Sequence, residues 1–343
     1  MAAKGTRRSA RVAVAAPVAS LRAAAYLCSP MQTRQLGRTS VRLTEITLGT
    51  WGLAAGSYGP VAPARFEATV QGALDAGVRS FDMSPLWGED GASERVVGRL
   101  TKSLRDECTY ITRGGVERTP EGVHSRFDRE SLVRDCEASL ARLGTERLDL
   151  LLWHHPSEAT LRGPDFHEAG AQLMRQGKIR AWGVTVSTSL EARLAIAAGA
   201  QAICVVYNLL SSDLLDDLLA NIVVSGTGVL VRSPLAYGLL AGTFARAQRF
   251  AADDHRARRW EAATLSKRVG AVEELRFLVQ DSVKSPADAA LRWVLSNTLI
   301  SSCIVGARTP AQASAAAAAS VGVPYLPEDA LARVPQVLAA LGL

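Results

Sequence analysis

Cysteine is scarce and scattered in this chain of 343 residues. The five cysteines, Cys28, Cys108, Cys136, Cys204 and Cys303, form no C-x-x-C pair and no metal-like spacing with histidine. This pattern argues against a disulfide framework and against a metal site. An odd, dispersed set predicts reduced thiols in a cytosol-like compartment. Cys108, Cys204 and Cys303 fall in or beside apolar runs, so we expect them to be small core residues.

A large excess of one charge is also absent from most of the chain. The formal charge is +6, but residues 1–30 contribute +5 of it and contain no acid. The remainder is nearly neutral and has no Lys/Arg stripe interleaved with aromatics, which argues against a nucleic-acid partner. The apolar stretch Val12–Leu21 is too short to span a bilayer, and Arg22 interrupts it. We therefore expect neither a nucleic-acid nor a membrane partner.

Residues 1–30 differ from the rest of the chain in being rich in Ala, Arg and Ser. A more ordinary composition begins at Met31, so we expect an extension that is disordered or outside the fold, followed by one domain over 31–343. Three interpretations stay open: an upstream start codon ahead of a true start at Met31, an organelle transit peptide, and a bacterial export signal built on Arg7-Arg8. The first agrees with a cytoplasmic protein and the second with organelle targeting.

No internal repeat or low-complexity linker divides the chain after Met31. With 48% hydrophobic and 21% charged residues, the composition is that of a globular protein with a core. Short apolar or β-branched runs alternate eight times with longer segments of helical period, which predicts a parallel sheet. The expected strands are Glu45–Gly49, Arg79–Met83, Thr109–Thr112, Leu148–Trp153, Ala181–Val184, Ala202–Tyr207, Gly228–Arg232 and Ser301–Val305.

Amphipathic helices are expected between these strands. One runs from Phe66 toward Gly77 and another from Leu132 toward Gly144, each with apolar residues on one face and a glycine at its end. Ser285 and Pro286 supply the N-cap and first position of a third. No G-x-G-x-x-G follows the first strand, so an open doubly wound sheet lacks its dinucleotide fingerprint. The eight units instead favour closure into a single-domain (β/α)₈ barrel, an α/β fold of the TIM-barrel type.

Four segments carry a resemblance to a known family. They contain Leu48-Gly49-Thr50-Trp51-Gly52, Gly77-Val78-Arg79-Ser80-Phe81-Asp82, Leu152-Trp153-His154-His155-Pro156 and Ile304-Val305-Gly306-Ala307-Arg308-Thr309. Together they resemble the aldo-keto reductases, and the resemblance runs from Met31 to about Gln312. It implies a (β/α)₈ barrel that reduces aldehydes or ketones with NADPH.

The family places an aspartate, a tyrosine, a lysine and a histidine around the substrate carbonyl. By resemblance Asp82 and His154 take the first and last of these positions, whereas Trp87 replaces the tyrosine and Arg113 the lysine. Hydride delivered to a carbonyl carbon leaves an alkoxide, which needs electrostatic stabilisation and a proton. Trp87 donates a hydrogen bond but no proton, and Arg113 is a permanent cation. We therefore expect weakened or altered catalysis.

Other residues near the strand ends are open to two interpretations. The candidates for a replacement acid, each with a packing or turn role as the alternative, are Tyr58, Ser84 and His155. Trp51, Trp87 and Trp153 are expected either to line an apolar pocket or to pack across the top of the barrel. The irregular stretch Gly242–Arg268 predicts a lid or binding loop, or else a solvated charged insertion.

The resemblance also implies where a nicotinamide cofactor binds. Arg308 and Thr309 follow Gly306 near a helix N-terminus, where backbone N–H groups and a cation favour a phosphate. Ala316 stands where the family has an asparagine. The expected cofactor-binding residues are Thr185, Cys204, Arg232, Ser233, Leu235, Gly238, Gly306, Arg308, Thr309 and Gln312.

The sequence thus predicts an NADP(H)-dependent oxidoreductase that reduces a small-molecule aldehyde or ketone. Two alternatives stay open. One is a degenerate barrel that binds a nucleotide or small ligand without redox turnover, and the other is non-redox chemistry such as dehydration or isomerisation. No surface pattern indicates a protein partner or an oligomeric state.

Overall fold

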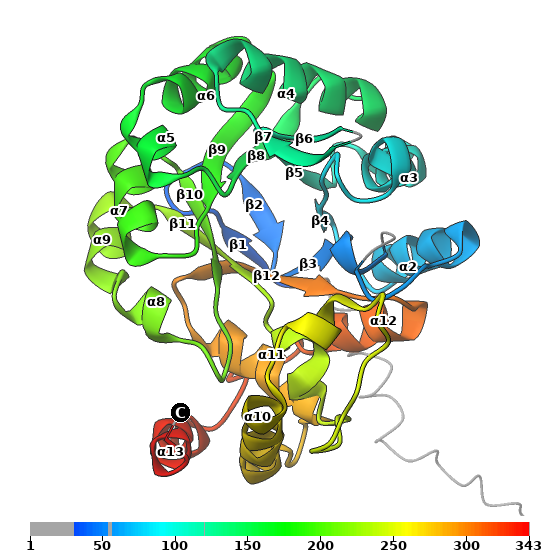
Figure 1. The fold of residues 1–343 in the computed structure, drawn as a ribbon, viewed down its shortest axis with the longest axis vertical. Helices are drawn as coiled ribbons and strands as arrows, with labels where there is room; N and C mark the ends of the chain where they lie inside the picture. The colour runs from blue at the N-terminus through cyan, green and yellow to red at the C-terminus, as the bar shows by residue number, and fades with distance from the viewer. Residues whose placement is uncertain (1–30, 54–56, 120, 343) are drawn as a thin grey trace, which may run out of the picture. The chain divides into compact units, whose positions relative to one another are not determined.

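Eight parallel strands close into a barrel in the order β10-β11-β12-β3-β4-β5-β8-β9 (Figure 1). The computed structural model describes residues 31–53, 57–119 and 121–342, and the extension predicted over residues 1–30 lies outside them. The barrel strands are β3 (Ile46–Gly49), β4 (Ser80–Asp82), β5 (Thr109–Gly114), β8 (Leu148–His154), β9 (Ile179–Thr185), β10 (Ala202–Val206), β11 (Gly228–Arg232) and β12 (Ile300–Gly306). The prediction of a (β/α)₈ barrel is confirmed, and each expected strand overlaps an observed one.

Helices surround the barrel and cover its outer face (Figure 1). They are α2 (Pro63–Asp75), α3 (Ala92–Leu100), α4 (Arg129–Leu143), α5 (Glu158–Arg162), α6 (Asp165–Arg175), α7 (Ser189–Ala197), α8 (Asp213–Asp216), α9 (Leu219–Ser225), α10 (Ala262–Glu274), α11 (Pro286–Ser296), α12 (Pro310–Ala318) and α13 (Glu328–Ala340). The expected caps are present. Gly144 takes the left-handed conformation after α4, and the Ser285 hydroxyl accepts a hydrogen bond from the backbone N–H of Asp288 at the start of α11.

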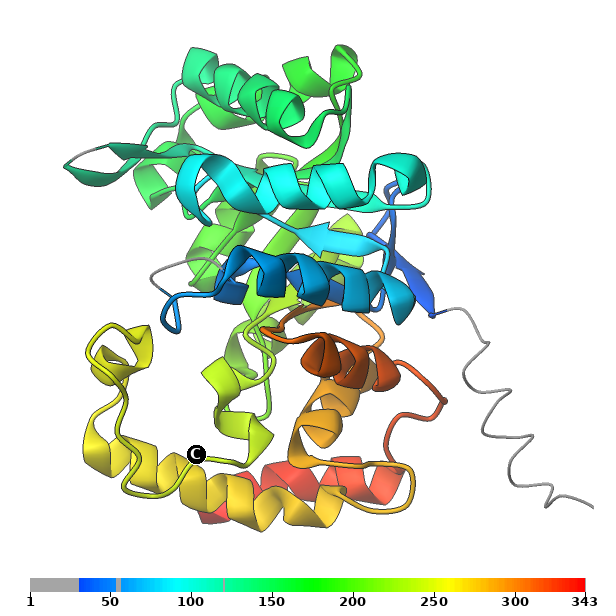
Figure 2. The same cartoon turned by 90° about the vertical axis from the view of Figure 1, so that its right-hand side faces the viewer.

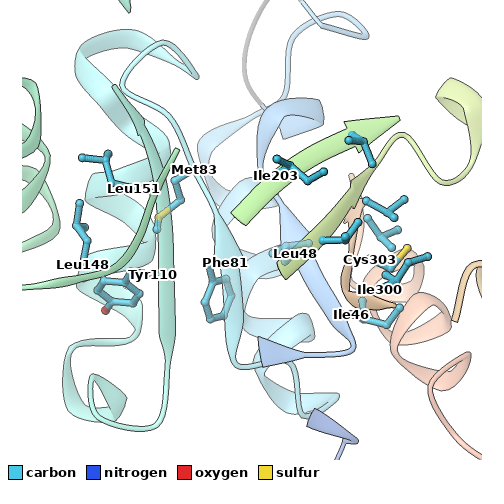
Figure 3. Packing of buried hydrophobic residues seen from close by; sticks show 14 of the residues in the cluster. Ile46, Leu48, Phe81, Met83, Tyr110, Leu148, Leu151, Ile203, Ile300 and Cys303 are labelled. Atoms are coloured by element: carbon cyan, nitrogen blue, oxygen red, sulfur yellow. The ribbon is translucent and has the colours of Figure 1, made fainter. Parts of the chain in front are cut away.

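Alternation along the strands divides the core into two layers. One set of strand side chains, including Leu48, Phe81 and Leu151, belongs to the large cluster that packs against the helices (Figure 3). The other set fills the barrel interior, where Cys204 and Leu230 are completely buried. Full burial of such an aliphatic side chain stabilises the fold by about 1.5–3 kcal/mol. The expectation that Cys108, Cys204 and Cys303 are buried core residues is confirmed.

An antiparallel hairpin of β1 (Thr33–Gln35) and β2 (Arg42–Thr44) contributes Leu36 and Leu43 to the interior layer of the barrel. Its turn lies against the start of β11. A Cβ at Gly37 would lie 2.3 Å from the Gly226 carbonyl oxygen, and Gly37 has φ +51°, so glycine is required here. The hairpin therefore covers the N-terminal ends of the strands and leaves the C-terminal ends for a site.

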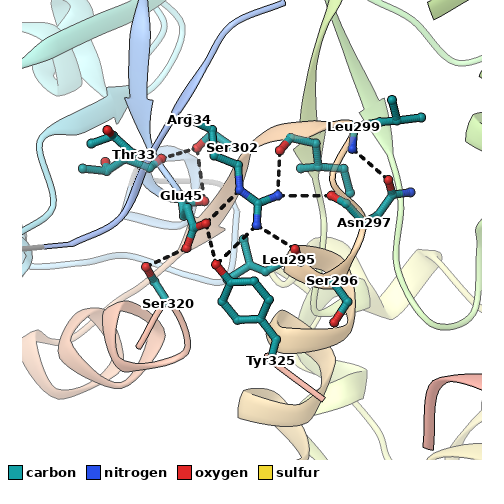
Figure 4. A network of polar contacts seen from close by, with 12 residues as sticks. Thr33, Arg34, Glu45, Leu295, Ser296, Asn297, Leu299, Ser302, Ser320 and Tyr325 are labelled. Atoms are coloured by element: carbon teal, nitrogen blue, oxygen red, sulfur yellow. Dashed lines mark hydrogen bonds and ion pairs between the residues drawn. The ribbon is translucent and has the colours of Figure 1, made fainter. Parts of the chain in front are cut away.

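A polar network ties this hairpin to the C-terminal third of the chain (Figure 4). The Arg34 Nε donates to Glu45 Oε1 at 2.7 Å, and its two Nη atoms donate to three carbonyl oxygens at the end of α11 and the start of β12. The hydroxyls of Ser320 and Tyr325 donate to the same buried Glu45 carboxylate. Arg34 thus satisfies helix-end carbonyls that would otherwise be buried without donors.

Two further features lie outside the barrel. β6 (Val116–Thr119) and β7 (Gly122–Ser125) pair as an antiparallel hairpin after β5, which projects to the side in Figure 2. The sequence did not predict it. Short 3-10 segments η1 (Trp51–Leu53), η2 (Glu89–Gly91), η3 (Lys102–Leu104), η4 (Ala236–Ala241), η5 (His255–Arg258) and η6 (Leu275–Leu278) complete the elements.

Candidate active site

A cavity of about 660 Å³ opens at the C-terminal ends of the barrel strands. Its walls come from residues at or just after those ends, from the segment after β11, and from the first turns of α11 and α12. The residues predicted from the sequence that line it are Asp82, Trp87, Arg113, His154, Thr185, Arg232, Ser233, Leu235, Gly238, Gly306, Arg308 and Gln312. The four predicted catalytic residues therefore share one cavity.

Asp82 and Arg113 form a buried ion pair at the cavity wall. Asp82 ends β4 and Arg113 lies on the neighbouring β5, so the Arg113 Nη2 donates to Asp82 Oδ2 at 2.9 Å. The side chains are only 2% and 4% exposed. Burial raises the pKa of Asp82 to about 6, although the Arg113 guanidinium opposes this rise. Asp82 Oδ1 and Arg113 Nε and Nη1 are buried without a hydrogen-bond partner, so the pair keeps unused hydrogen-bonding capacity in the cavity wall.

The indole of Trp87 covers the cation of this pair. The Arg113 Cζ lies 4.9 Å from the centre of the Trp87 ring, which is a cation–π contact. Trp87 comes shortly after β4, and its backbone N–H donates to the Ser84 carbonyl. Trp87 thus stabilises the guanidinium of Arg113. Neither side chain releases a proton near neutral pH.

His154 ends β8 on the same side of the barrel. Burial, and then the positive charge of Arg113, lowers the pKa of His154 to about 2. The ring is therefore neutral at physiological pH and still donates one N–H. Its Nδ1 has no hydrogen-bond partner. A neutral imidazole beside a permanent cation is suited to polarising a carbonyl oxygen.

The three candidates for a replacement acid lie in different surroundings. His155 has φ +50°, lines the cavity, and has its Nδ1 3.4 Å from the Ser187 hydroxyl. Burial lowers the pKa of His155 to about 4. Tyr58 also lines the cavity, but burial raises its pKa to about 12. Ser84 is fully buried and does not line the cavity. Its hydroxyl accepts a hydrogen bond from the Leu86 N–H.

Most of the expected cofactor residues line the cavity, and two of them do not. Thr185, Arg232 and Arg308 line the cavity, and Thr185 Oγ1, Arg232 Nε and Arg308 Nε are buried without a hydrogen-bond partner. Cys204 does not line it, because this residue lies within β10 rather than at its end and its side chain packs in the barrel interior. Thr309 does not line it either, because its hydroxyl caps α12.

Arg308 has a structural role as well as a position at the cavity. Its Nη atoms donate to the carbonyl oxygens of Tyr58, Gly59 and Pro60 at 2.8, 3.2 and 3.3 Å. Its backbone N–H donates to the Gln312 side chain at 2.8 Å. Arg308 therefore joins the start of α12 to the segment that follows β3.

The segment after β11 has an unusual backbone. Ser233, Ala236 and Tyr237 adopt positive φ angles of 55°, 46° and 60°, and Gly238 follows with 92°. Such conformations cost about 1–3 kcal/mol each for residues other than glycine, and they concentrate at functional sites. Ser233, Tyr237 and Gly238 all line the cavity.

The stretch Gly242–Arg268 contains a lid over the cavity mouth rather than a solvated insertion. We call residues 253–260 the lid. The His255 N–H donates to the Ser57 carbonyl at 3.1 Å, and Arg256 and Arg259 line the cavity. The lid lies beside the loop that precedes α2, as the yellow and dark blue segments of Figure 2 show. Asp254 accepts from the Arg256 guanidinium through both carboxylate oxygens.

The aromatic residues near the strand ends differ in whether they line the cavity. Trp51 and Trp87 line the cavity, the first of the two interpretations given above. Trp153 does not, because it belongs to the outer layer of the barrel and is completely buried. Tyr237 lines the cavity but was not predicted, since it lies between Leu235 and Gly238 in a segment recognised only for its neighbours.

The described ranges 31–53, 57–119 and 121–342 contain neither a cluster of metal ligands nor a helix fit to span a membrane. No three His, Cys, Asp or Glu side chains there gather closely enough to hold a metal ion. No helix within these ranges has the length and apolarity needed to cross a membrane.

A closed barrel with a polar cavity at the C-terminal ends of its strands is the architecture of TIM-barrel enzymes. The sequence model of the Aldo/keto reductase family matches residues 45–338, and the chain belongs to that family of oxidoreductases. Aldo-keto reductase YhdN of Bacillus subtilis is 28% identical over 292 residues, which cover 83% of this chain and 87% of the relative.

Solved structures agree with this assignment. The glycerol dehydrogenase AKR11B4 from Gluconobacter oxydans superposes with a TM-score of 0.79 at 26% identity, covering 90% of this chain and 95% of that one. The holo form of aldo-keto reductase AKR11C1 from Bacillus halodurans shares the fold with a TM-score of 0.75 at 20% identity, covering 90% and 96%. Aldo-keto reductases generally use nicotinamide cofactors and act on small carbonyl compounds.

Proposed function

We propose that this protein reduces a small aldehyde or ketone with NADP(H), at a rate limited by the absence of a tyrosine acid. The observation that carries the proposal is the meeting of Asp82, Trp87, Arg113 and His154 in one cavity. By resemblance, these residues take the four positions that the family uses around the carbonyl group. Buried polar atoms without partners surround them, as expected for a site that binds polar ligands.

The cofactor would occupy the side of the cavity formed by β9, β11 and α12. Thr185 and Arg232 would hold the nicotinamide end, with Ser233, Leu235 and Gly238 along the turn after β11. The residues for the 2′-phosphate end would be Gly306, Arg308 and Gln312, beside the N-terminus of α12. When bound, NADPH supplies the hydride.

The chain's own residues would then orient and polarise the carbonyl group. His154 and Trp87 each donate an N–H toward the substrate oxygen, and Arg113 provides a fixed positive charge where the alkoxide forms. Asp82 holds Arg113 in place through the 2.9 Å ion pair. Because neither Trp87 nor Arg113 titrates, and His155 is neutral near pH 7, the proton comes from water. Loss of a general acid lowers a rate by about 10²–10⁴-fold.

The proposal is tested by following NADPH consumption with a panel of aldehydes and ketones. We expect slow, saturable turnover with at least one of them. His154→Ala should lower kcat by about 10–100-fold while cofactor affinity stays unchanged, because one hydrogen-bond donor to the developing charge is lost. An equal kcat for the wild-type protein and His154→Ala would contradict the role of His154.

The second candidate function is binding of a nucleotide without turnover. The replacement of both titrating positions by Trp87 and Arg113 favours it. Saturable NADPH binding combined with no consumption for any carbonyl compound would establish this alternative and overturn the first proposal.

A further inference from the structure

Arg259 of the lid is a cation at the cavity without an acidic partner. Five arginines line the cavity: Arg113, Arg232, Arg256, Arg259 and Arg308. Asp82 neutralises the first of these, and Asp254 neutralises Arg256. No carboxylate of the described residues lies within ion-pair distance of Arg232 or Arg259. Arg308 has no such carboxylate either and is assigned above to the 2′-phosphate, so Arg232 and Arg259 are the two further cations left for a ligand.

These two arginines lie in different surroundings. Arg232 ends β11 and lies close to His154 and His155, on the side of the cavity where the nicotinamide is expected. Arg259 instead lies on the lid, with its Cζ 3.5 Å from the centre of the Tyr237 ring. A guanidinium stacked in this way keeps the donors at its edge available for a second group. Arg259 is therefore held in position without having its hydrogen-bonding capacity used.

The aromatic residues beside Arg259 form a neutral box. Trp51, Tyr58, Tyr237 and His255 come from three separate segments and meet edge to face, with ring centres 4.8–6.4 Å apart. Burial lowers the pKa of His255 to about 4 and raises that of Tyr58 to about 12, so both rings are uncharged at neutral pH. The walls of this box offer Arg259 no anion.

We propose that Arg259 binds a carboxylate of the substrate, so that the preferred substrates are aldehydes or ketones with a carboxylate remote from the carbonyl group. This assignment rests on the proposed function and names the substrate class of the same cavity. The aromatic box accommodates the apolar middle of such a molecule. A guanidinium recognises a carboxylate through charge-assisted, often paired hydrogen bonds.

Binding without turnover gives the first test. Fluorescence of the cavity tryptophans, with NADP⁺ present at saturation, reports the binding of 4-(hydroxymethyl)benzoate and of benzyl alcohol, which differ by one carboxylate. We expect the carboxylate to bind about tenfold more tightly, and Arg259→Met to remove this preference. Arg258→Met is the matched control, because Arg258 is an exposed lid arginine that does not line the cavity.

Turnover gives the second test. We expect kcat/KM for 4-carboxybenzaldehyde to exceed that for benzaldehyde by about tenfold, with the ratio falling toward one in Arg259→Met and persisting in Arg258→Met. Arg259→Lys should keep part of the preference, since the charge remains but the planar fork is lost. Because Arg259 is exposed, the preference should also shrink as ionic strength rises.

Three outcomes separate this proposal from its alternatives. Equal affinity of the wild-type protein for the two alcohols would overturn it. Weaker NADP⁺ binding by Arg259→Met, with the carboxylate preference intact, would assign Arg259 to the cofactor and would also overturn it. If no aldehyde is reduced but the carboxylate preference is present and depends on Arg259, the proposed reductase function fails while the anion site stands.

Discussion

At the scale of single residues, the charge of the cavity is fixed by groups that titrate far from neutral pH. His154 and His155 are neutral because burial lowers the pKa of the first to about 2 and of the second to about 4. Arg113 is always charged. Asp82 is the exception among the four central residues, because burial raises its pKa to about 6.

The pH profile of kcat/KM should therefore show one transition, near pH 6. Above it Asp82 is ionised and orients Arg113, and as pH falls through 6 the carboxylate takes a proton and the ion pair is lost. We expect kcat/KM to decrease on the acid side and to stay flat on the alkaline side, where a tyrosine acid would otherwise titrate. Asp82→Asn should remove the acid transition, and an alkaline decrease in the wild-type protein would contradict this account.

Restoring the proton donor is the most direct change at this scale. The double variant Trp87→Tyr/Arg113→Lys places a tyrosine beside a lysine whose charge lowers the tyrosine pKa. We expect aldehyde turnover to rise by about 10²–10⁴-fold, the contribution of general acid catalysis. The two single variants are the controls and should gain less, because each lacks one half of the pair. An unchanged rate in the double variant would count against the assignment of these positions.

At the scale of elements, the hairpin β1–β2 and the helix α11 depend on Arg34. Its removal leaves the buried Glu45 carboxylate without a cation and several carbonyl oxygens without donors. We expect Arg34→Met to lower the free energy of unfolding by about 3–5 kcal/mol, as for other broken buried pairs. Arg42→Met, on the exposed side of the hairpin, should change it by less than about 0.5 kcal/mol. Urea unfolding curves of both variants measure the difference.

The lid is the second element with a testable role. Asp254 holds the Arg256 guanidinium and accepts a hydrogen bond from its backbone N–H, which shapes the first turn of η5. Asp254→Ala should loosen the lid and weaken NADPH binding by about tenfold, because a charge-assisted contact is lost. Its neighbour Asp253, which is exposed, provides the control variant Asp253→Ala. Equal cofactor affinity in the two variants would show that the lid does not contribute to binding.

At the scale of the whole molecule, the periodicity of the sequence was sufficient to predict the barrel fold. Eight apolar runs separated by amphipathic helices predicted every barrel strand to within a few residues, since alternation of this kind has few compact solutions. The same reasoning placed Asp82 and His154 at strand ends, where the structure has them. Closure of the barrel then brings together strand ends that lie far apart in the sequence.

Other features depended on contacts that a sequence pattern does not encode. Trp153 was expected either to line a pocket or to pack, and it packs in the outer layer, because adjacent strand positions face opposite sides of the barrel wall. Cys204 faces the barrel interior but lies within β10 rather than at its end. Thr309 was expected at the phosphate end of the cofactor, and the structure places its hydroxyl as the N-cap of α12. The lid was recognised as a loop, but its contacts with Ser57 and Tyr58 join segments almost 200 residues apart, which only the closed fold brings together.

The central claim is that the cavity of this barrel binds a nicotinamide cofactor beside Asp82, Trp87, Arg113 and His154. A fluorescence titration of the full chain with NADPH tests it most directly. The account predicts saturable binding that Arg308→Met weakens more for NADPH than for NADH, because the two cofactors differ only in the 2′-phosphate. A titration without saturable binding of either cofactor would contradict it.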